Sequence, residues 1–401
     1  MRREEKSRTV IFSLFSVCER FFVLKFAGKR IVRVLKLKSK MKKILYIVLL
    51  VLVLSGCSEG AKHGNQMLQI DEREGYIEVR VMDPWKKGRV LHTYLLVERD
   101  RELPDGLPEG TIVRTPLRRV LVYSDVHARA IAELGSVSSV SSVCDARYFK
   151  TPEIVAGLRN GGVTDCGDSH SPSVERIVSV SPEAIILSPF ENGGYGALEN
   201  MGIPIIEMAD YMESSPLERA RWIEFLGCLF GKQKEAAAIY RRVEADYKSL
   251  CRLVEQTDEK RPTVISETVT GGVWYVPGGK SYKATLYKDA GADYPWSDDL
   301  SAGSLSLDFP QVLDKAQKAD FWLVTTYGQE LDGTVLKGIY AHNDQFEAFS
   351  NGGVYFFDSQ KSGLFEETPF HPERLLKEYV KLFHPQLLPD YDLRYYKKMT
   401  E

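Results

Sequence analysis

The stretch AAAIYRRVEADYKSLCRLV, residues 236–254, predicts a long helix near the middle of the chain. Its apolar side chains recur at steps of four and three residues and so share one helix face: Ala236, Tyr240, Val243, Tyr247, Leu250 and Val254. Ser215 and Pro216 suit a helix N-cap and a first helical position, so the helical stretch is expected to start there and to relax near Gly231. One apolar face with charged flanks favours a helix packed between two lobes over a coiled coil.

Short apolar strands alternate with helices before this long helix. Strands are expected at 76–81, 91–97, 119–123, 184–188 and 203–208, and helices at 125–134, 174–180 and 196–201. Alternation of this kind indicates a parallel sheet with helices on both faces. We therefore expect an N-terminal αβ lobe over residues 67–214.

A second αβ unit follows the long helix, after the polar residues 256–261. Strands are expected at 262–266, 321–325 and 354–357, and helices at 282–290, 309–318 and 372–383. The predicted fold class is therefore α/β, with two Rossmann-like lobes joined by one long helix. The helix is assigned to residues 215–256 and the C-terminal lobe to 261–401, and each lobe is long enough for its own core.

The residues from Met41 onward predict export. They read MKKILYIVLLVLVLSGCSEG, with two lysines, an apolar run too short to span a bilayer, and small residues before Cys57. Residues 41–56 are thus expected to be a signal peptide, and the ending Leu-Ser-Gly-Cys resembles a bacterial lipobox with Cys57 as the lipidated residue. Residues 1–40 are interpreted as an over-extended start, with a basic cytoplasmic leader as the alternative.

The charge and the cysteines narrow the class of partner. Residues 1–56 carry 14 of the 53 Lys and Arg but 3 of the 55 Asp and Glu, so residues 57–401 hold 39 basic and 52 acidic side chains, a net charge of −13. That balance disfavours a nucleic-acid partner. A disulfide between Cys144 and Cys166 stays open, and no cysteine or histidine spacing suggests zinc.

Two segments carry a resemblance to a known family. The segments PSVERIVSVSPEAII (172–186) and GGKSYKATLYKDAG (278–291), in this order around the long helix, resemble substrate-binding lipoproteins of ABC importers for iron complexes, haem and cobalamin. The resemblance covers roughly residues 115–390. It implies the class III periplasmic binding protein fold, a monomer, an ABC permease dimer with its ATPase as partner, and a periplasmic or cell-surface location on a lipid anchor.

The resemblance also implies where function lies. Ligands are expected in a cleft between the lobes, on loops at the carboxyl ends of strands. Aromatic faces with a few polar groups suit a flat macrocycle or an aryl-rich chelate, and Arg147 and Lys280 suit its carboxylates. The candidate ligand-binding residues are Tyr123, Ser124, Arg147, Tyr148, His170, Tyr195, Trp274, Tyr275, Lys280, Tyr282 and Tyr327. Permease docking is expected at Glu175, and on the second lobe at Asp308, where the family pattern fits poorly.

Competing functions are disfavoured by spacing. In GGVWYVPGGKS (271–281) a phosphate-binding loop would need a glycine where Trp274 stands, so the segment is interpreted as a ligand wall. No Gly-x-Ser-x-Gly motif suggests a hydrolase. We expect no enzyme, no resident cofactor and no metal site, although His170 or a tyrosine is a possible ligand of an exposed iron. A lipoprotein that scavenges haem or chelates without a permease is the alternative function.

Overall fold

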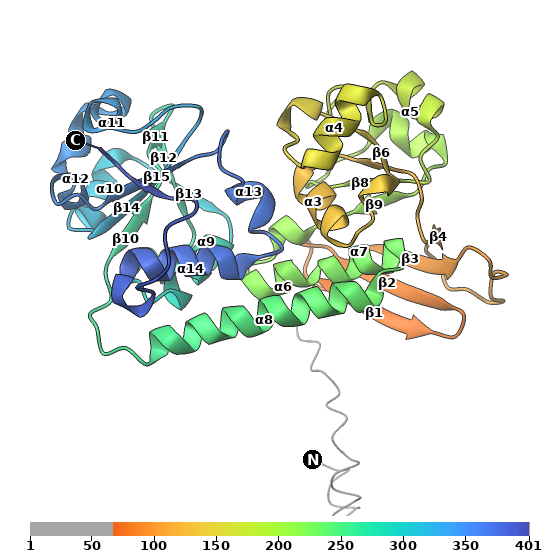
Figure 1. The fold of residues 1–401 in the computed structure, drawn as a ribbon, viewed down its shortest axis with the longest axis horizontal. Helices are drawn as coiled ribbons and strands as arrows, with labels where there is room; N and C mark the ends of the chain where they lie inside the picture. Colours follow the sequence, from red (N-terminus) through yellow and green to blue (C-terminus); the bar gives the residue numbers. More distant parts are fainter. Residues whose placement is uncertain (1–66, 401) are drawn as a thin grey trace, which may run out of the picture. The chain divides into compact units, whose positions relative to one another are not determined.

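The computed structural model describes residues 67–400, so the predictions for residues 1–56 and for Cys57 lie outside the described residues. Residues 65–401 form one compact unit. Within it lie four sheets, two in each half of the chain, and helices α6 to α8 pass between the halves (Figure 1). We call the half that contains strands β1 to β9 the N-terminal lobe and the half that contains strands β10 to β16 the C-terminal lobe.

The first sheet of the N-terminal lobe precedes the αβ alternation. Its strands are β1 (Leu68–Arg73), β2 (Tyr76–Met82), β3 (Val90–Glu98) and β4 (Thr111–Thr115). Strands β1 to β3 pair antiparallel, and β4 joins β3 in parallel. The strands expected at 76–81 and 91–97 are confirmed. They do not enter the parallel sheet, however, because two-residue and seven-residue turns return the chain at once.

The second sheet of the N-terminal lobe is fully parallel and has the order β7-β6-β5-β8-β9. Its strands are β5 (Val120–Val122), β6 (Val140–Val143), β7 (Thr164–Asp165), β8 (Ala184–Leu187) and β9 (Ile205–Glu207). The helices of this lobe are α3 (Asp125–Glu133), α4 (Pro152–Asn160) and α5 (Val174–Val180). Strands β5 and β8 are completely buried, which explains their unbroken apolar sequences.

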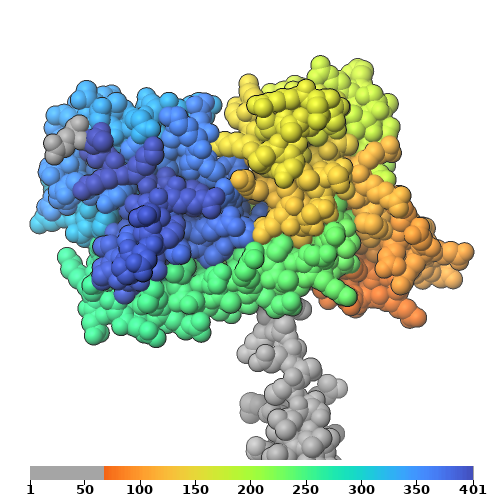
Figure 2. All heavy atoms as spheres, in the orientation of Figure 1, coloured from red at the N-terminus to blue at the C-terminus, as the bar shows by residue number. Residues whose placement is uncertain are grey.

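Three helices replace the single helical stretch expected from Ser215. They are α6 (Pro216–Arg221), α7 (Ile223–Phe230) and α8 (Gln233–Glu255). Gly231 ends α7 in the left-handed conformation, at φ 66°, so the chain reverses there rather than merely relaxing. Helix α8 then packs against α7 and against α14 (Pro372–Phe383), and thus spans both lobes (Figures 1 and 2).

The C-terminal lobe has a main sheet with the order β10-β14-β15-β16 and a smaller sheet with the order β11-β12-β13. The main strands are β10 (Val264–Ser266), β14 (Phe321–Thr326), β15 (Val354–Asp358) and β16 (Lys397–Lys398). The smaller sheet contains β11 (Val269–Thr270), β12 (Val273–Pro277) and β13 (Ser304–Leu307). The helices are α9 (Tyr282–Asp289), α10 (Phe309–Ala316), α11 (Gly333–Ile339), α12 (Glu347–Ser350), α13 (Leu364–Glu367) and α14.

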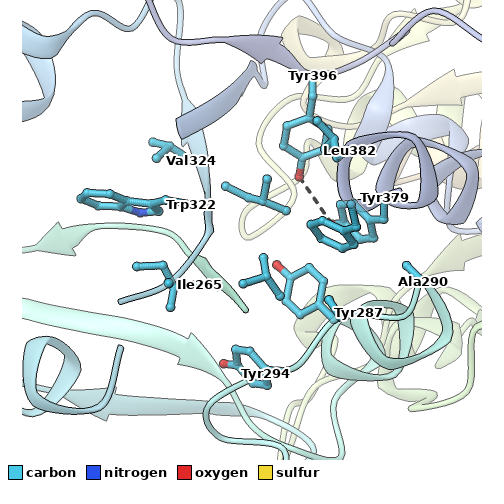
Figure 3. Packing of buried hydrophobic residues seen from close by; sticks show 14 of the residues in the cluster. Ile265, Tyr287, Ala290, Tyr294, Trp322, Val324, Tyr379, Leu382 and Tyr396 are labelled. Atoms are coloured by element: carbon cyan, nitrogen blue, oxygen red, sulfur yellow. Dashed lines mark hydrogen bonds between the residues drawn. The ribbon is translucent and has the colours of Figure 1, made fainter. Parts of the chain in front are cut away.

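Each lobe has its own large apolar core. The core of the C-terminal lobe is rich in aromatic rings, and Figure 3 shows Tyr287, Tyr379 and Tyr396 converging there. The hydroxyls of Tyr379 and Tyr396 lie 3.4 Å apart, which gives each a polar partner in an apolar setting. The two cores are distinct, although Phe370 of the C-terminal half packs in the core of the N-terminal lobe. The boundaries expected at residues 214, 256 and 261 stay predictions.

Candidate functional site

A hollow opens at the carboxyl ends of the parallel strands in the N-terminal lobe. Its volume is about 550 Å³, and loops that follow β5, β7 and β8 line it. Four predicted residues meet there: Tyr123, Ser124, His170 and Tyr195. Parallel strands bring their following loops to one edge, so residues distant in the sequence converge.

The loop after β8 supplies an aromatic wall that sequence reasoning missed. Phe190 lines the hollow, is largely exposed, and meets Tyr195 edge-on at 6.4 Å between ring centroids. A Cβ placed on Gly193 would lie 2.2 Å from the Phe190 ring, so only glycine permits this packing. The signal was present as an aromatic residue followed by Gly193 and Gly194 directly after a buried strand.

The phenols of the hollow are held neutral. Burial, and then the nearby Cys144, raises the pKa of Tyr123 far above its usual value. Burial and the Glu207 carboxylate likewise raise the pKa of Tyr195, whose hydroxyl donates to Glu207 at 2.6 Å. The hollow therefore presents neutral aromatic faces and hydroxyls, and proton loss from either phenol to give an iron ligand is disfavoured.

A second group of predicted residues lies on the loop after β6. The Arg147 guanidinium stacks over the Tyr148 ring at 4.7 Å from the ring centroid, and Tyr148 is exposed. Two residues later, Lys150 reaches the C-terminal lobe: its Nζ donates to the Ser359 carbonyl at 2.7 Å and pairs with Glu366 at 2.8 Å. Arg147 and Tyr148 thus stand close to where the lobes meet.

The C-terminal lobe presents aromatic side chains on the loop after β14 and on helix α13, which follows β15. Tyr327 is 67 % exposed, and Phe365 is 51 % exposed. Tyr327 follows Thr326, whose carbonyl accepts hydrogen bonds from both the backbone and the hydroxyl of Ser359. Because Lys150 binds the same Ser359, Tyr327 is placed beside the contact between the lobes. Phe365 and Lys150 had no signal in the sequence.

Trp274 does not line a cleft, and this prediction is wrong. The ring is fully buried, stacks on Trp322 at 5.5 Å between centroids, and donates its Nε1–H to the Ser266 carbonyl at 2.9 Å. The segment is strand β12, in which alternate side chains point to opposite faces. Trp274 therefore faces the core while its neighbour Tyr275 is exposed on the smaller sheet.

Two further predicted residues lie elsewhere. The Tyr282 ring lies under the Arg219 guanidinium of α6, and its hydroxyl donates to the Thr368 carbonyl, so Tyr282 connects α6 with the segment that follows α13. Lys280 is exposed beside the loop 296–303, and its backbone N–H donates to the Ser301 carbonyl. Neither residue lines the hollow. The Ser281 side chain caps α9, so the N-terminus of this helix already has a hydrogen-bond partner within the protein.

The two docking candidates differ in how far their carboxylates take part in local structure. Glu175 is exposed in the first turn of α5, where its own backbone N–H and the Ser173 hydroxyl lower the pKa of the carboxyl. Asp308 instead forms a capping box at the start of α10, since its carboxylate accepts the Gln311 N–H at 2.9 Å. Asp308 thus has a structural role that explains its position before Pro310 without any docking.

Cysteines and metal ligands can be assessed within residues 67–400. Cys144 and Cys166 are both free and buried, so the disulfide left open by the sequence is not formed. Among the described residues no group of three His, Cys, Asp or Glu side chains could hold a metal ion. His170 is exposed, and its Nδ1 lies 3.4 Å from the Asp168 carboxylate and 3.5 Å from the Ser169 hydroxyl. An iron bound in the hollow would therefore have to bring most of its own ligands.

A larger hollow of about 710 Å³ lies between α8 and α14, lined mainly by charged and polar side chains. It is distant in the fold from the strand ends, because α8 and α14 pack on the other side of the lobes (Figure 1). We favour the smaller hollow as the candidate site, since binding in open αβ sheets occurs at the carboxyl ends of strands.

Comparison with known proteins agrees with this architecture. Residues 138–360, more than half of the chain, match the periplasmic binding protein family, so the chain belongs to that family. Residues 41–58 match the prokaryotic membrane lipoprotein lipid attachment site, and Cys57 is the cysteine within that match. The chain is therefore an exported, membrane-anchored lipoprotein. Within residues 67–400, no helix has both the length and the apolar character needed to cross a membrane.

One curated relative and two solved structures illustrate the likeness. An uncharacterized lipoprotein of Methanocaldococcus jannaschii is 26% identical over 317 residues, 74% of each chain. A possible iron-binding, periplasmic solute-binding protein of Staphylococcus epidermidis aligns with a TM-score of 0.55 at 14% identity, covering 67% of this chain and 100% of that one. The periplasmic haem-binding protein HutB of Vibrio cholerae gives 0.53 at 16% identity, covering 67% and 99%.

These neighbours confirm the expected fold class, an α/β fold of the class III periplasmic binding protein type, although three helices rather than one pass between the lobes. The family and the neighbours are named as binding proteins and none as an enzyme, in agreement with the expectation of a binding protein. The alignments include almost the whole of each neighbour but only about two thirds of this chain. This chain therefore carries segments that the two neighbours lack.

Proposed function

We propose that this lipoprotein captures an iron chelate, haem or a corrinoid and delivers it to an ABC permease. The observation that carries the proposal is the aromatic hollow at the strand ends, walled by Tyr123, Phe190 and Tyr195 with neutral phenols. Its volume of about 550 Å³ lies within the usual range for small-molecule sites.

The chemistry of the walls supports a flat, partly apolar ligand. Rings stacked or edge-on against a conjugated macrocycle contribute dispersion and apolar burial without the need to neutralise charge. Arg147, on the loop after β6, suits a carboxylate at the ligand's rim. Tyr327 and Phe365 supply aromatic contacts from the C-terminal lobe. The neighbours named for iron and haem fit this class of ligand.

Titration tests the ligand class directly. The mature lipoprotein in detergent is titrated with haem, with a ferric hydroxamate and with cobalamin, while the absorbance spectrum and the melting temperature are followed. At least one of the three is expected to bind and to raise the melting temperature. Phe190→Ala should weaken that binding, whereas Tyr275→Ala, an exposed aromatic outside the hollow, should not. No response to any of the three ligands would contradict the proposal.

Transport tests the permease partner separately. Glu175→Arg reverses the charge on the exposed first turn of α5, at a residue that is not among those lining the hollow. We expect this variant to bind ligand normally and to lose uptake through the cognate permease, while Asp308→Asn keeps uptake. Unchanged uptake and ligand binding by Glu175→Arg would contradict the docking role of Glu175. Ligand binding by the wild-type protein without any permease-dependent uptake would instead favour a scavenging lipoprotein.

A further inference from the structure

The turn between β2 and β3 is held in shape by hydrogen bonds within it. We call residues 83–89, DPWKKGR, the hairpin tip. The Asp83 carboxylate accepts the backbone N–H groups of Trp85 and Lys86, each at 2.9 Å. The Asp83 N–H in turn donates to the Arg89 carbonyl at 2.9 Å, which closes the turn. The tip is therefore held in shape by Asp83 and by the backbone, without help from its lysine and arginine side chains.

The tip concentrates positive charge on an acidic protein. Lys86, Lys87 and Arg89 are all exposed, and none of them forms an ion pair with a carboxylate of the described residues. Asp83 is the only acid in the tip, and its carboxylate is occupied by the turn. The chain after residue 56 has a net charge of −13, so this cluster runs against the overall charge. Its free cations point to an anionic partner.

Trp85 gives the tip an apolar component. It is partly exposed, whereas the other four tryptophans of the chain are buried: Trp222, Trp274, Trp296 and Trp322. A tryptophan beside lysine and arginine is the combination enriched where proteins meet the headgroup region of a bilayer. Clustered cations next to a membrane attachment point are similarly attracted to anionic lipids.

The tip also lies near the start of the folded part. The Met82 N–H, at the base of the tip, donates to the Met67 carbonyl at 2.7 Å. Met67 follows Cys57 by ten residues, and a chain of ten residues reaches at most about 35 Å. Lipid on Cys57 therefore limits how far the tip can move from the bilayer and raises the effective concentration of headgroups around it.

We propose that the hairpin tip binds anionic phospholipid headgroups and gives the lipoprotein a second membrane contact beside its lipid. Lys86, Lys87 and Arg89 contact phosphate groups, and Trp85 enters the interfacial region. A lipid chain combined with a basic patch holds a protein on a membrane more firmly than either does alone. This contact is independent of the ligand hollow, which opens at the strand ends of the other sheet.

Quenching of Trp85 fluorescence tests the contact. The mature lipoprotein is reconstituted in vesicles of phosphatidylcholine alone, or of equal parts phosphatidylcholine and phosphatidylglycerol, with brominated acyl chains in each. Because the other tryptophans are buried in the protein, quenching reports on Trp85. We expect quenching in the anionic vesicles at low salt, its reversal at high salt, and little quenching in phosphatidylcholine alone.

A matched pair of variants removes equal charge from two places. The tip variant is Lys86→Ala, Lys87→Ala and Arg89→Ala, and the control is Lys260→Ala, Lys288→Ala and Lys318→Ala, three exposed lysines of the second half of the chain. The tip variant should lose quenching at an unchanged melting temperature, while the control keeps it. For lipid-free residues 65–401, a compact unit, partition to anionic vesicles should fall about a hundredfold in the tip variant.

Three results would overturn the proposal. They are the absence of quenching in anionic vesicles, equal quenching in both lipid compositions, and equal loss in the two triple variants. The last result would assign the effect to overall charge rather than to the tip. Binding of the tip to heparin or nucleic acid without vesicle binding would also assign the cluster to a different anion.

Discussion

The Lys150 ammonium of the N-terminal lobe donates a hydrogen bond to the Ser359 carbonyl of the C-terminal lobe at 2.7 Å. The same ammonium donates to the Ser362 carbonyl at 3.0 Å and pairs with Glu366 at 2.8 Å. One side chain thus fastens the loop after β6 to the loop after β15, next to the aromatic residues of both lobes.

Removal of this ammonium should loosen the contact between the lobes. Lys150 is 29 % exposed, and hydrogen bonds from a charged donor contribute about 1.5–3 kcal/mol. We expect Lys150→Met to lower the free energy of unfolding by about 2 kcal/mol in urea denaturation. Hydrogen exchange should rise in residues 359–367. Lys361→Met, 62 % exposed with an ion pair to Asp358, is the control and should cost less than about 0.5 kcal/mol.

Crowding of the aromatic wall should weaken ligand binding. A methyl group on Gly193 collides with the Phe190 ring, so Gly193→Ala must move that ring out of its position. We expect affinity for the bound chelate, haem or corrinoid to fall about fivefold, since an aromatic contact is worth about 1 kcal/mol. Gly338→Ala introduces a methyl group with no atom within 4 Å and should leave affinity unchanged. Equal affinities in the two variants would remove Phe190 from the site.

The two neighbouring aromatics of β12 should behave in opposite ways. Trp274→Ala should destabilise the protein by about 3–5 kcal/mol, because it opens a cavity beside Trp322 and leaves the Ser266 carbonyl without its partner. Tyr275→Ala should change stability by less than about 0.5 kcal/mol. Thermal and urea unfolding measure both. Trp274→Phe, which keeps a ring in the core, should retain ligand affinity, and a specific loss of affinity there would reinstate Trp274 as a contact.

His371 should make the stability of the lobe contact depend on pH. Burial opposes its charge, but hydrogen bonds with Glu133 at 2.6 Å and Glu373 at 2.9 Å outweigh burial and raise the pKa of His371. A raised pKa means that the contribution to stability is complete below the unfolded value near 6.5 and is lost as pH rises through the folded pKa. Glu133, whose pKa is lowered, contributes above its usual value of 4.5 and loses its contribution as pH falls.

The melting temperature from pH 6 to pH 9 measures this dependence. The wild-type protein should lose more stability over that range than His371→Gln, which keeps polar contacts but does not titrate. Burial raises the pKa of Glu213 to about 7, so Glu213 also makes the folded state less stable as pH rises. Its contribution must be measured separately from that of His371. Glu213→Gln serves as that control, and its effect should add to that of His371→Gln. Parallel curves for wild type and His371→Gln would contradict the prediction.

Much of the fold was accessible from the sequence because local patterns and packing agree. The apolar stripe from Ala236 to Val254 became the buried face of α8, and the apolar runs of β5 and β8 became central strands. The sequence predicted that the helical stretch relaxes near Gly231, but not that the chain reverses direction there. Its positive φ depends on the packing of α7 against α8, which a helical repeat does not contain.

The site was less accessible, because strand alternation and long-range contacts decide which side chains face it. In the segment 271–281 the aromatic residues were noticed, yet only the pairing of β12 between β11 and β13 fixes which ring points inward. Gly278 and Gly279 are required by carbonyl groups of the loop 296–303, which would lie 2.4 Å from a Cβ at either position. From the sequence alone Lys150 cannot be told from an ordinary surface lysine, because its partners lie more than 200 positions away.

Helix α8 packs on both lobes, and Lys150 and the Arg129–Glu367 pair bridge them as well. We therefore expect little closure when ligand arrives. If the receptor barely changes shape on binding, the transporter cannot distinguish loaded from empty copies by a large conformational difference. Empty and loaded copies would then compete for the same transporter. Uptake would then depend on the ratio of loaded to empty receptors, and overproduction of the lipoprotein at scarce ligand should slow transport rather than speed it.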